Sequence, residues 1–115
     1  MITEAFKLSD GKISIQGHEI CLPYTVSKAL SCLGLIIVKI DPPAGRFSNR
    51  NIFALSMNGE VCWQIQESPH STQDDKPYVD ISIDSSGALI ADNWNGVSYL
   101  VNQINGNVTA DRFDN

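Results

Sequence analysis

Two side chains could in principle carry covalent chemistry, a thiol at Cys62 and an imidazole at His70. A cysteine becomes a nucleophile when an adjacent base, a helix N-terminus or a strained turn stabilises its thiolate. Cys62 instead lies in the middle of an alternating segment that is typical of a β-strand. We therefore interpret Cys62 as structural and expect no catalytic residue and no enzyme activity. A cysteine-dependent enzyme built on this pair stays open as an alternative.

The sequence contains no residue spacing that is typical of a metal-binding or cofactor-binding site. The two histidines, His18 and His70, form no HxxxH pair, and the cysteines at 21, 32 and 62 form no CxxC pair. Zinc sites need such closely spaced nitrogen and sulfur ligands, and nucleotide cofactors need glycine-rich phosphate loops, which the chain also lacks. We expect no metal and no cofactor.

Charge is distributed unevenly along the chain. Residues 1–59 carry six cationic and four anionic side chains and residues 60–115 carry two and nine, for a net charge of −5. An acidic half of this kind repels nucleic acid and anionic lipid, whereas it attracts basic proteins. The chain is thus expected to bind neither nucleic acid nor membrane. The candidate partner-binding residues are the acidic side chains and one aromatic side chain of this half: Glu67, Asp74, Asp75, Asp80, Asp84, Asp92 and Trp94.

Trp94 is singled out because it precedes Asn95-Gly96 in a predicted turn, where a large aromatic side chain is expected to be partly exposed. Binding hot spots are rich in Trp, Tyr and Arg. Trp63 alternates with polar neighbours in a predicted strand, and we place it in the core. The adjacent pair Asp74-Asp75 is typical of a solvated loop.

The elements that position these residues are predominantly β. Apolar and polar residues alternate between turn signals such as Asn58-Gly59, which predicts a mainly β, antiparallel meander, sandwich or half-barrel of about 8–10 short strands in one domain, 1–115. The run Leu35–Ile40 predicts a central strand buried on both faces. Residues 24–33 place Val26, Leu30 and Leu33 at helical spacing, so a short helix is an open alternative there.

The longest apolar stretch, residues 33–38, is far shorter than the roughly 20 residues of a membrane helix, and the first residues resemble no secretory signal. We expect a cytoplasmic protein.

Two families share part of this pattern. The segments 51–55 and 58–65, an apolar strand followed by Asn-Gly and a Trp strand, resemble a blade hairpin of quinoprotein-type β-propellers, and 89–100 repeats that cadence. A propeller needs at least four blades, more than this chain can hold. Residues 35–110 are also similar to small stand-alone bacterial immunity proteins, the partners of polymorphic or contact-dependent growth-inhibition toxins. This resemblance implies a protein partner and no catalytic residues.

The sequence therefore predicts a protein-binding module. In its most concrete form it is an immunity protein whose acidic face covers the basic cleft of a toxin, such as a nuclease, in place of the nucleic acid. The alternative is a structural or adaptor domain that acts by homo-oligomerisation through a sheet edge.

Overall fold

The computed structural model describes residues 6–43, 45–46, 48–69 and 76–112, with no side-chain description for 111 and 112. These ranges contain strands and turns but no helix, which confirms the predicted antiparallel β class. The strands are β1 (Phe6–Ser9), β2 (Lys12–Ile15), β3 (His18–Ile20), β4 (Thr25–Cys32), β5 (Leu35–Asp41), β6 (Ile52–Leu55), β7 (Val61–Gln64), β8 (Tyr78–Ile83), β9 (Leu89–Asn93), β10 (Ser98–Val101) and β11 (Val108–Arg112).

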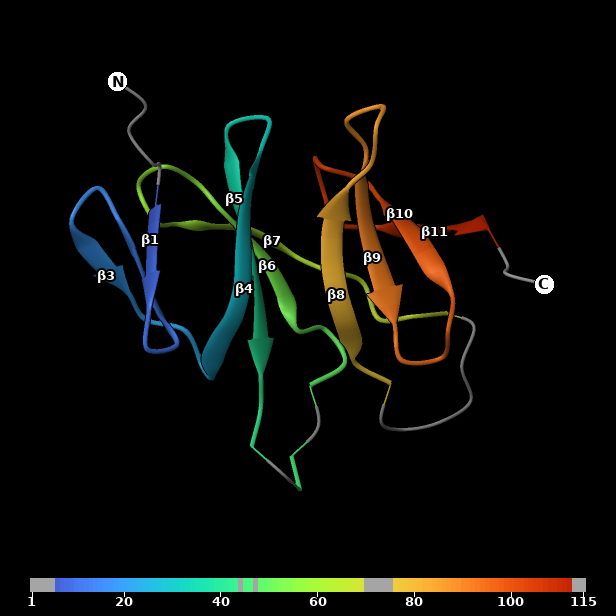
Figure 1. Cartoon of the computed structure of the whole chain (residues 1–115), viewed down its shortest axis with the longest axis horizontal. Helices are drawn as coiled ribbons and strands as arrows, with labels where there is room; N and C mark the ends of the chain where they lie inside the picture. Colours follow the sequence, from blue (N-terminus) through green and yellow to red (C-terminus); the bar gives the residue numbers. More distant parts are fainter. Residues whose placement is uncertain (1–5, 44, 47, 70–75, 113–115) are drawn as a thin grey trace.

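The strands form three sheets, each from one continuous stretch of chain (Figure 1). We call them the N-terminal sheet (β1-β2-β3), the central sheet (β4-β5-β6-β7) and the C-terminal sheet (β11-β10-β9-β8). Within each sheet, strands that follow one another in the sequence pair antiparallel. The central sheet lies between the other two (Figure 1).

The helix considered for residues 24–33 is wrong, because β4 pairs with β5 along its whole length. A β-bulge between Val26 and Lys28 shifts the alternation, so Val26 and Ala29 share one face and Leu30 and Cys32 the other. This shift produces a spacing that imitates a helix. Leu33, the third residue of the helical pattern, is 82% exposed in the turn to β5.

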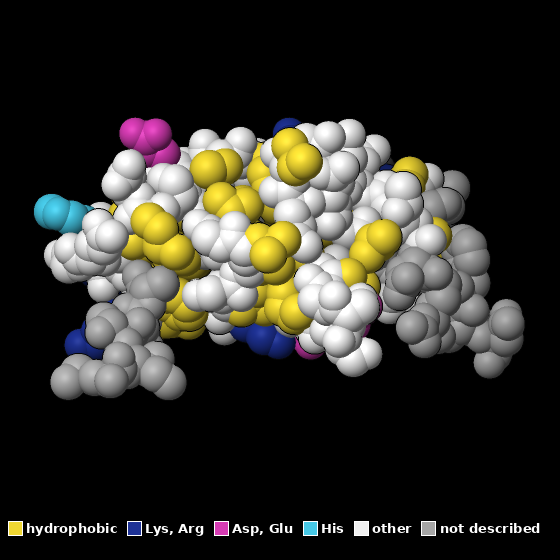
Figure 2. All heavy atoms as spheres, turned by 90° about the horizontal axis from the view of Figure 1, so that it is seen from above, with side chains coloured by type: hydrophobic (Ala, Val, Ile, Leu, Met, Phe, Trp, Pro, Cys, Tyr) yellow, Lys and Arg dark blue, Asp and Glu magenta, His cyan; other side chains and the backbone are white. Residues whose placement is uncertain are grey.

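The hairpin turns lie at the ends of the strands. The predicted Asn58-Gly59 hairpin is confirmed, with Ser56 donating its backbone N–H to the carbonyl of Glu60 at 2.8 Å. Of the two turn residues, Gly59 alone has a positive φ, 84°. In Figure 1 the β4–β5 and β8–β9 turns lie at the upper end of the molecule, and Figure 2 looks down on that end, where hydrophobic side chains appear among polar atoms.

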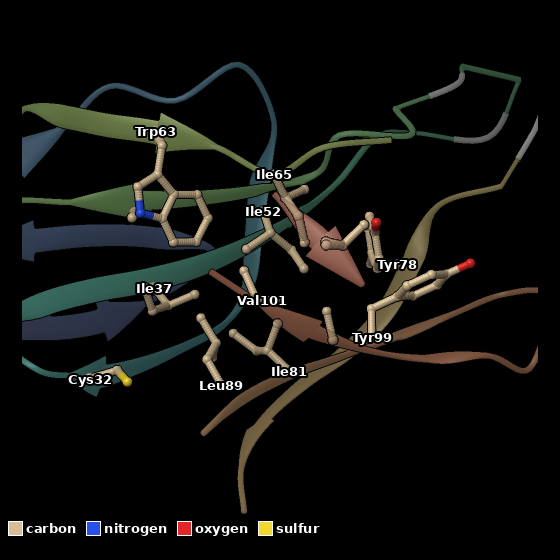
Figure 3. Close-up of a cluster of buried hydrophobic side chains, with 13 residues drawn as sticks. Cys32, Ile37, Ile52, Trp63, Ile65, Tyr78, Ile81, Leu89, Tyr99 and Val101 are labelled. Atoms are coloured by element: carbon tan, nitrogen blue, oxygen red, sulfur yellow. The ribbon is translucent and has the colours of Figure 1, made fainter. Parts of the chain in front are cut away.

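The central sheet is buried on both faces, as predicted for residues 35–40. Ile36, Val38 and Ile40 of β5 face the N-terminal sheet, and Ile37 faces the C-terminal sheet. Ile37 belongs to the buried hydrophobic cluster shown in Figure 3, which joins the central and C-terminal sheets. Its members include Trp63, Ile65, Tyr78, Ile81, Leu89 and Tyr99. The core position predicted for Trp63 is confirmed at 6% exposure.

Side chains and turns link the two facing sheets at their sides. At one side, Lys28 Nζ of β4 lies 2.7 Å from Asp80 Oδ1 of β8. At the other side, Gln66 donates its backbone N–H to the carbonyl of Gly106 at 2.9 Å and accepts the N–H of Val108 on its side-chain oxygen at 2.9 Å. The central and C-terminal sheets thus form a sandwich whose two sides are each joined by polar contacts.

Candidate protein-binding site

Trp94 lies in the β9–β10 turn and is 57% exposed, which confirms the expected exposure. The turn is closed by bonds of 3.0 Å from the N–H of Asn93 to the carbonyl of Val97 and from the N–H of Gly96 to the carbonyl of Asn93. The N–H of Trp94 donates to the carbonyl of Pro77 at 3.0 Å. The indole therefore projects from a backbone that is fixed on both sides.

A buried polar network holds this turn from below. Ser68 Oγ lies 2.6 Å from the Tyr99 hydroxyl, and Asn95 Nδ2 donates to Ser68 Oγ at 3.2 Å. Ser68 is 1% exposed. Tyr78 donates its hydroxyl to the carbonyl of Gln66 at 2.7 Å, and burial raises the pKa of Tyr78 well above its usual value. Such buried, protonated hydroxyls serve as hydrogen-bonding groups that order the turn.

One predicted acidic residue lies close to this turn. Glu67 Oε1 is 3.4 Å from Lys76 Nζ and accepts a hydrogen bond of 3.2 Å from Asn49 Nδ2. Asn93 Nδ2 donates to the backbone carbonyl of Lys76 at 2.9 Å, which connects the ion pair to the base of the Trp94 turn. Asp74 and Asp75 lie outside the described residues.

Two further carboxylates meet on the C-terminal sheet. Asp80 and Asp92 are direct register partners on β8 and β9. The hydrogen bond from Lys28 lowers the pKa of Asp80, and Asp92 accepts a bond of 2.7 Å from Ser98 Oγ. Both carboxylates therefore have partners within the fold. The side chain of Asp80 is still 48% exposed and can accept further donors.

Asp84 lies at the other end of β9 from Trp94. Its Oδ1 accepts bonds from Ser86 Oγ at 2.6 Å and from the backbone N–H groups of Ser86 and Ala88 at 2.9 and 3.0 Å. These hydrogen bonds lower the pKa of Asp84. Five strand residues at about 3.4 Å each separate the two turns, so Asp84 is roughly 17 Å from the Trp94 turn. The predicted acidic residues thus occupy three separate places.

The cysteines show no arrangement for catalysis among the described residues. Cys62 is exposed on β7, and His70, its proposed base, lies outside the described residues. Cys32 is buried, its pKa is raised by burial, and its thiol lies 2.9 Å from Gln103 Oε1. The described residues contain no group of three His, Cys, Asp or Glu side chains that could hold a metal ion.

An apolar tip that the sequence analysis did not identify lies at the upper end of the sandwich. Leu33 in the β4–β5 turn is 82% exposed, and Ile104 in the β10–β11 loop is 88% exposed. The preceding residues, Cys32 and Gln103, contact each other at 2.9 Å, so the two tips are neighbours. Leu33 also has a positive φ of 49°, which is rare for a bulky residue. The residue pair Leu33-Gly34 between two strands signals the turn, but nothing in it signals the exposure.

None of the described segments forms a helix with the length and apolar character that a membrane crossing requires. A family model described as "Domain of unknown function (DUF7957)" matches residues 3–113. No curated protein and no solved structure matches the chain.

Proposed function

The chain belongs to the DUF7957 family, a domain of unknown function, and we propose that it is a protein-binding domain whose anchor is Trp94. The observation that carries the proposal is the exposure of this indole, 57%, on a turn that is fixed by hydrogen bonds. An aromatic side chain held in advance by its backbone loses little conformational entropy when a partner covers it. Removing such an anchor typically lowers affinity by about 30-fold or more.

The charge of the chain favours a basic partner. The net charge is −5 and the acidic side chains concentrate in the second half of the sequence. The Lys28–Asp80 and Lys76–Glu67 pairs leave their carboxylate side chains 48% and 49% exposed. Surface pairs of this kind contribute only about 0–1 kcal/mol, so an arginine of a partner can share the carboxylates. Long-range attraction then speeds association and weakens as salt rises.

The most concrete form of this function is an immunity protein that neutralises a toxin, such as a nuclease, by covering its basic active-site cleft. The acidic charge and the Trp94 anchor support that proposal, together with the resemblance of residues 35–110 to immunity proteins. We place its action in the cytoplasm. The three free cysteines agree with that compartment, since reducing conditions keep thiols unpaired.

The test uses the tagged chain as bait in a lysate of its source cells, at low and at high salt. The captured protein is identified, expressed alone to measure growth inhibition, and then co-expressed with the wild type, Trp94→Ala or Leu33→Asn. Leu33→Asn is the matched control, because it removes an exposed apolar side chain at the opposite end of the sandwich. We expect wild type and Leu33→Asn to restore growth and Trp94→Ala to fail. Equal protection by Trp94→Ala would refute the proposed anchor.

A second candidate function is self-association through the apolar tip. Leu33 and Ile104 are the two most exposed large hydrophobic residues of the described chain, and Leu33 is also strained by its positive φ. Exposure and strain at one residue often mark a functional contact. Sedimentation velocity tests this function. A dimer that Leu33→Asn converts to monomer supports it, and a monomeric wild type at 100 µM, about 10⁻⁴ M, excludes it at any useful affinity.

A further inference from the structure

A hollow of about 400 Å³ lies between the end of β5, the loop that follows it and the start of β8. Its apolar wall comes from Pro42, Pro43 and Pro77, and its charged wall from Lys39 and Arg46. The lining includes neither Trp94 nor the apolar tip, although Pro77, which lines the hollow, accepts the backbone N–H of Trp94 on its carbonyl.

The unusual member of the lining is Lys39. It is 7% exposed, and its Nζ lies 2.7 Å from Asp41 Oδ1, whose side chain is 52% exposed. Burying an ammonium group is costly, and a partner that faces water only partly offsets the cost. A structural ion pair would form more favourably at the surface. Lys39 thus presents a cation, paired with one half-exposed carboxylate, at the wall of the hollow.

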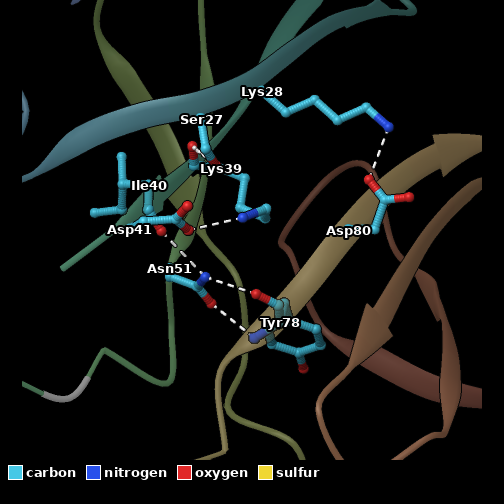
Figure 4. A network of polar contacts seen from close by, with 8 residues as sticks. All are labelled: Ser27, Lys28, Lys39, Ile40, Asp41, Asn51, Tyr78 and Asp80. Atoms are coloured by element: carbon cyan, nitrogen blue, oxygen red, sulfur yellow. Dashed lines mark hydrogen bonds and ion pairs between the residues drawn. The ribbon is translucent and has the colours of Figure 1, made fainter. Parts of the chain in front are cut away.

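Asn51 keeps the hollow in shape. Its Oδ1 accepts the N–H of Tyr78 at 2.9 Å, and its Nδ2 donates to the carbonyls of Tyr78 at 2.9 Å and Ile40 at 3.2 Å (Figure 4). The amide thus joins the end of β5 and the residue before β6 to the start of β8. All three bonds go to backbone, so they fix the strand side of the wall.

The charges define the ligand. Lys39 and Arg46 contribute two positive charges and Asp41 one negative charge, so the lining carries +1 in a chain of −5. The charge of Lys39 also helps to lower the pKa of Asp80, but the Asp80 carboxylate is already paired with Lys28. A ligand with one negative charge neutralises the lining, whereas the two negative charges of a phosphate dianion exceed its single positive charge. The proline wall offers apolar contact to the rest of the ligand.

We propose that this hollow binds a small organic carboxylate, with the carboxylate group at Lys39 and Arg46 and an apolar body against the three prolines. Two other hollows, of about 380 and 310 Å³, lie on the N-terminal sheet and share Asp10, Lys12 and Glu19. These three side chains are all exposed and together carry a negative charge. No buried cation lines either of them, so they lack the feature that defines the site at Lys39.

The experiment is a titration of the ¹⁵N-labelled chain with phenylacetate, acetate or inorganic phosphate, followed by amide chemical shifts. We expect phenylacetate to shift the amides of Lys39, Gly45 and Val79 with a Kd on the order of 1 mM, as befits a ligand of this size. Acetate should bind more weakly, because it lacks the apolar body. Phosphate binding tighter than phenylacetate would overturn the assignment, and so would a phenylacetate titration that leaves these amides unmoved.

Variants assign the contacts. Lys39→Met keeps the length of the side chain without its charge, and Arg46→Gln changes an exposed residue that the fold does not need. Each should weaken phenylacetate binding by about tenfold or more, because a charged hydrogen bond is lost. Lys7→Met, an equal charge change at an exposed position on the N-terminal sheet, is the matched control and should bind as the wild type does. Unchanged binding by both Lys39→Met and Arg46→Gln would refute the site. Trp94→Ala should still bind phenylacetate, which separates this test from that of the protein-binding function.

Discussion

Replacing Asn51 by alanine should destabilise the fold strongly, because one buried side chain satisfies three backbone groups. Asn51 is 1% exposed, and its two bonds to Tyr78 are each 2.9 Å long. The two shorter bonds contribute about 1 kcal/mol each, and the longer bond to Ile40, the unpaired groups and the small cavity together add about 1 kcal/mol. The expected loss in the free energy of unfolding is therefore about 3 kcal/mol.

Urea denaturation measures this loss, followed by both tryptophan fluorescence and far-ultraviolet circular dichroism to establish a two-state transition. With a slope of about 2 kcal/mol per molar, the midpoint should fall by about 1.5 M, and the melting temperature by roughly 10 °C. The matched control is Asn58→Ala in the β6–β7 turn, where the asparagine is exposed; it should change stability by less than about 0.5 kcal/mol. A loss at Asn51 no larger than that at Asn58 would refute the reasoning.

Three further predictions concern single groups. Gly106→Ala places a Cβ 2.5 Å from Cε3 of the Trp63 ring and should lower the unfolding free energy measured in urea by about 2 kcal/mol or more. Gly96→Ala, also at positive φ but with open space around it, should lower it by about 1 kcal/mol. Equal losses would contradict the packing argument. Hydrogen bonds hold the pKa of Asp84 below its ordinary 3.8, so their stabilisation is complete above that pH and is lost as the pH falls through the lower folded value. Asp84→Asn should therefore flatten the acid side of the stability curve, and an unaltered curve would speak against the bonds. Cys32 should resist a thiol reagent until the chain unfolds, while the two exposed cysteines react at once; three fast thiols would contradict its burial.

The sequence predicts the strands well where alternation is uninterrupted. Leu35–Ile40 and the Asn58-Gly59 hairpin follow from local rules, because β-branched runs and Asn-Gly pairs act over a few residues. Bulges defeat those rules. The bulge in β4 makes a strand look helical, and the bulge between Ala54 and Leu55 of β6 leaves Val61 53% exposed although alternation places it in the core with Trp63. An extra residue in one strand is invisible until its partner strand is known.

The candidate site is predictable only in part. The turn signal Asn95-Gly96 directly follows Trp94 in the sequence, so the exposure of Trp94 could be predicted from neighbouring residues alone. The partners of the carboxylates do not, since Lys28 is 52 residues from Asp80 along the chain. The buried strand predicted for Leu35–Ile40 includes Lys39, but the hollow beside it is hidden for the same reason. The ion pair of Lys39 with Asp41 is local, two residues along β5, whereas the hollow forms only when the chain returns as β8.

The order of the three sheets along the chain has a consequence for synthesis. A hairpin closes in about 1–10 µs, whereas the ribosome adds about 5–20 residues per second, so within each sheet a strand can pair with its predecessor as it emerges. The cluster between the N-terminal and central sheets draws on no residue beyond Met57 and is complete when half of the chain exists. The cluster between the central and C-terminal sheets needs Val108. During the second half of translation the nascent protein therefore carries one finished core and one bare apolar face, and that face is the surface on which a chaperone would act.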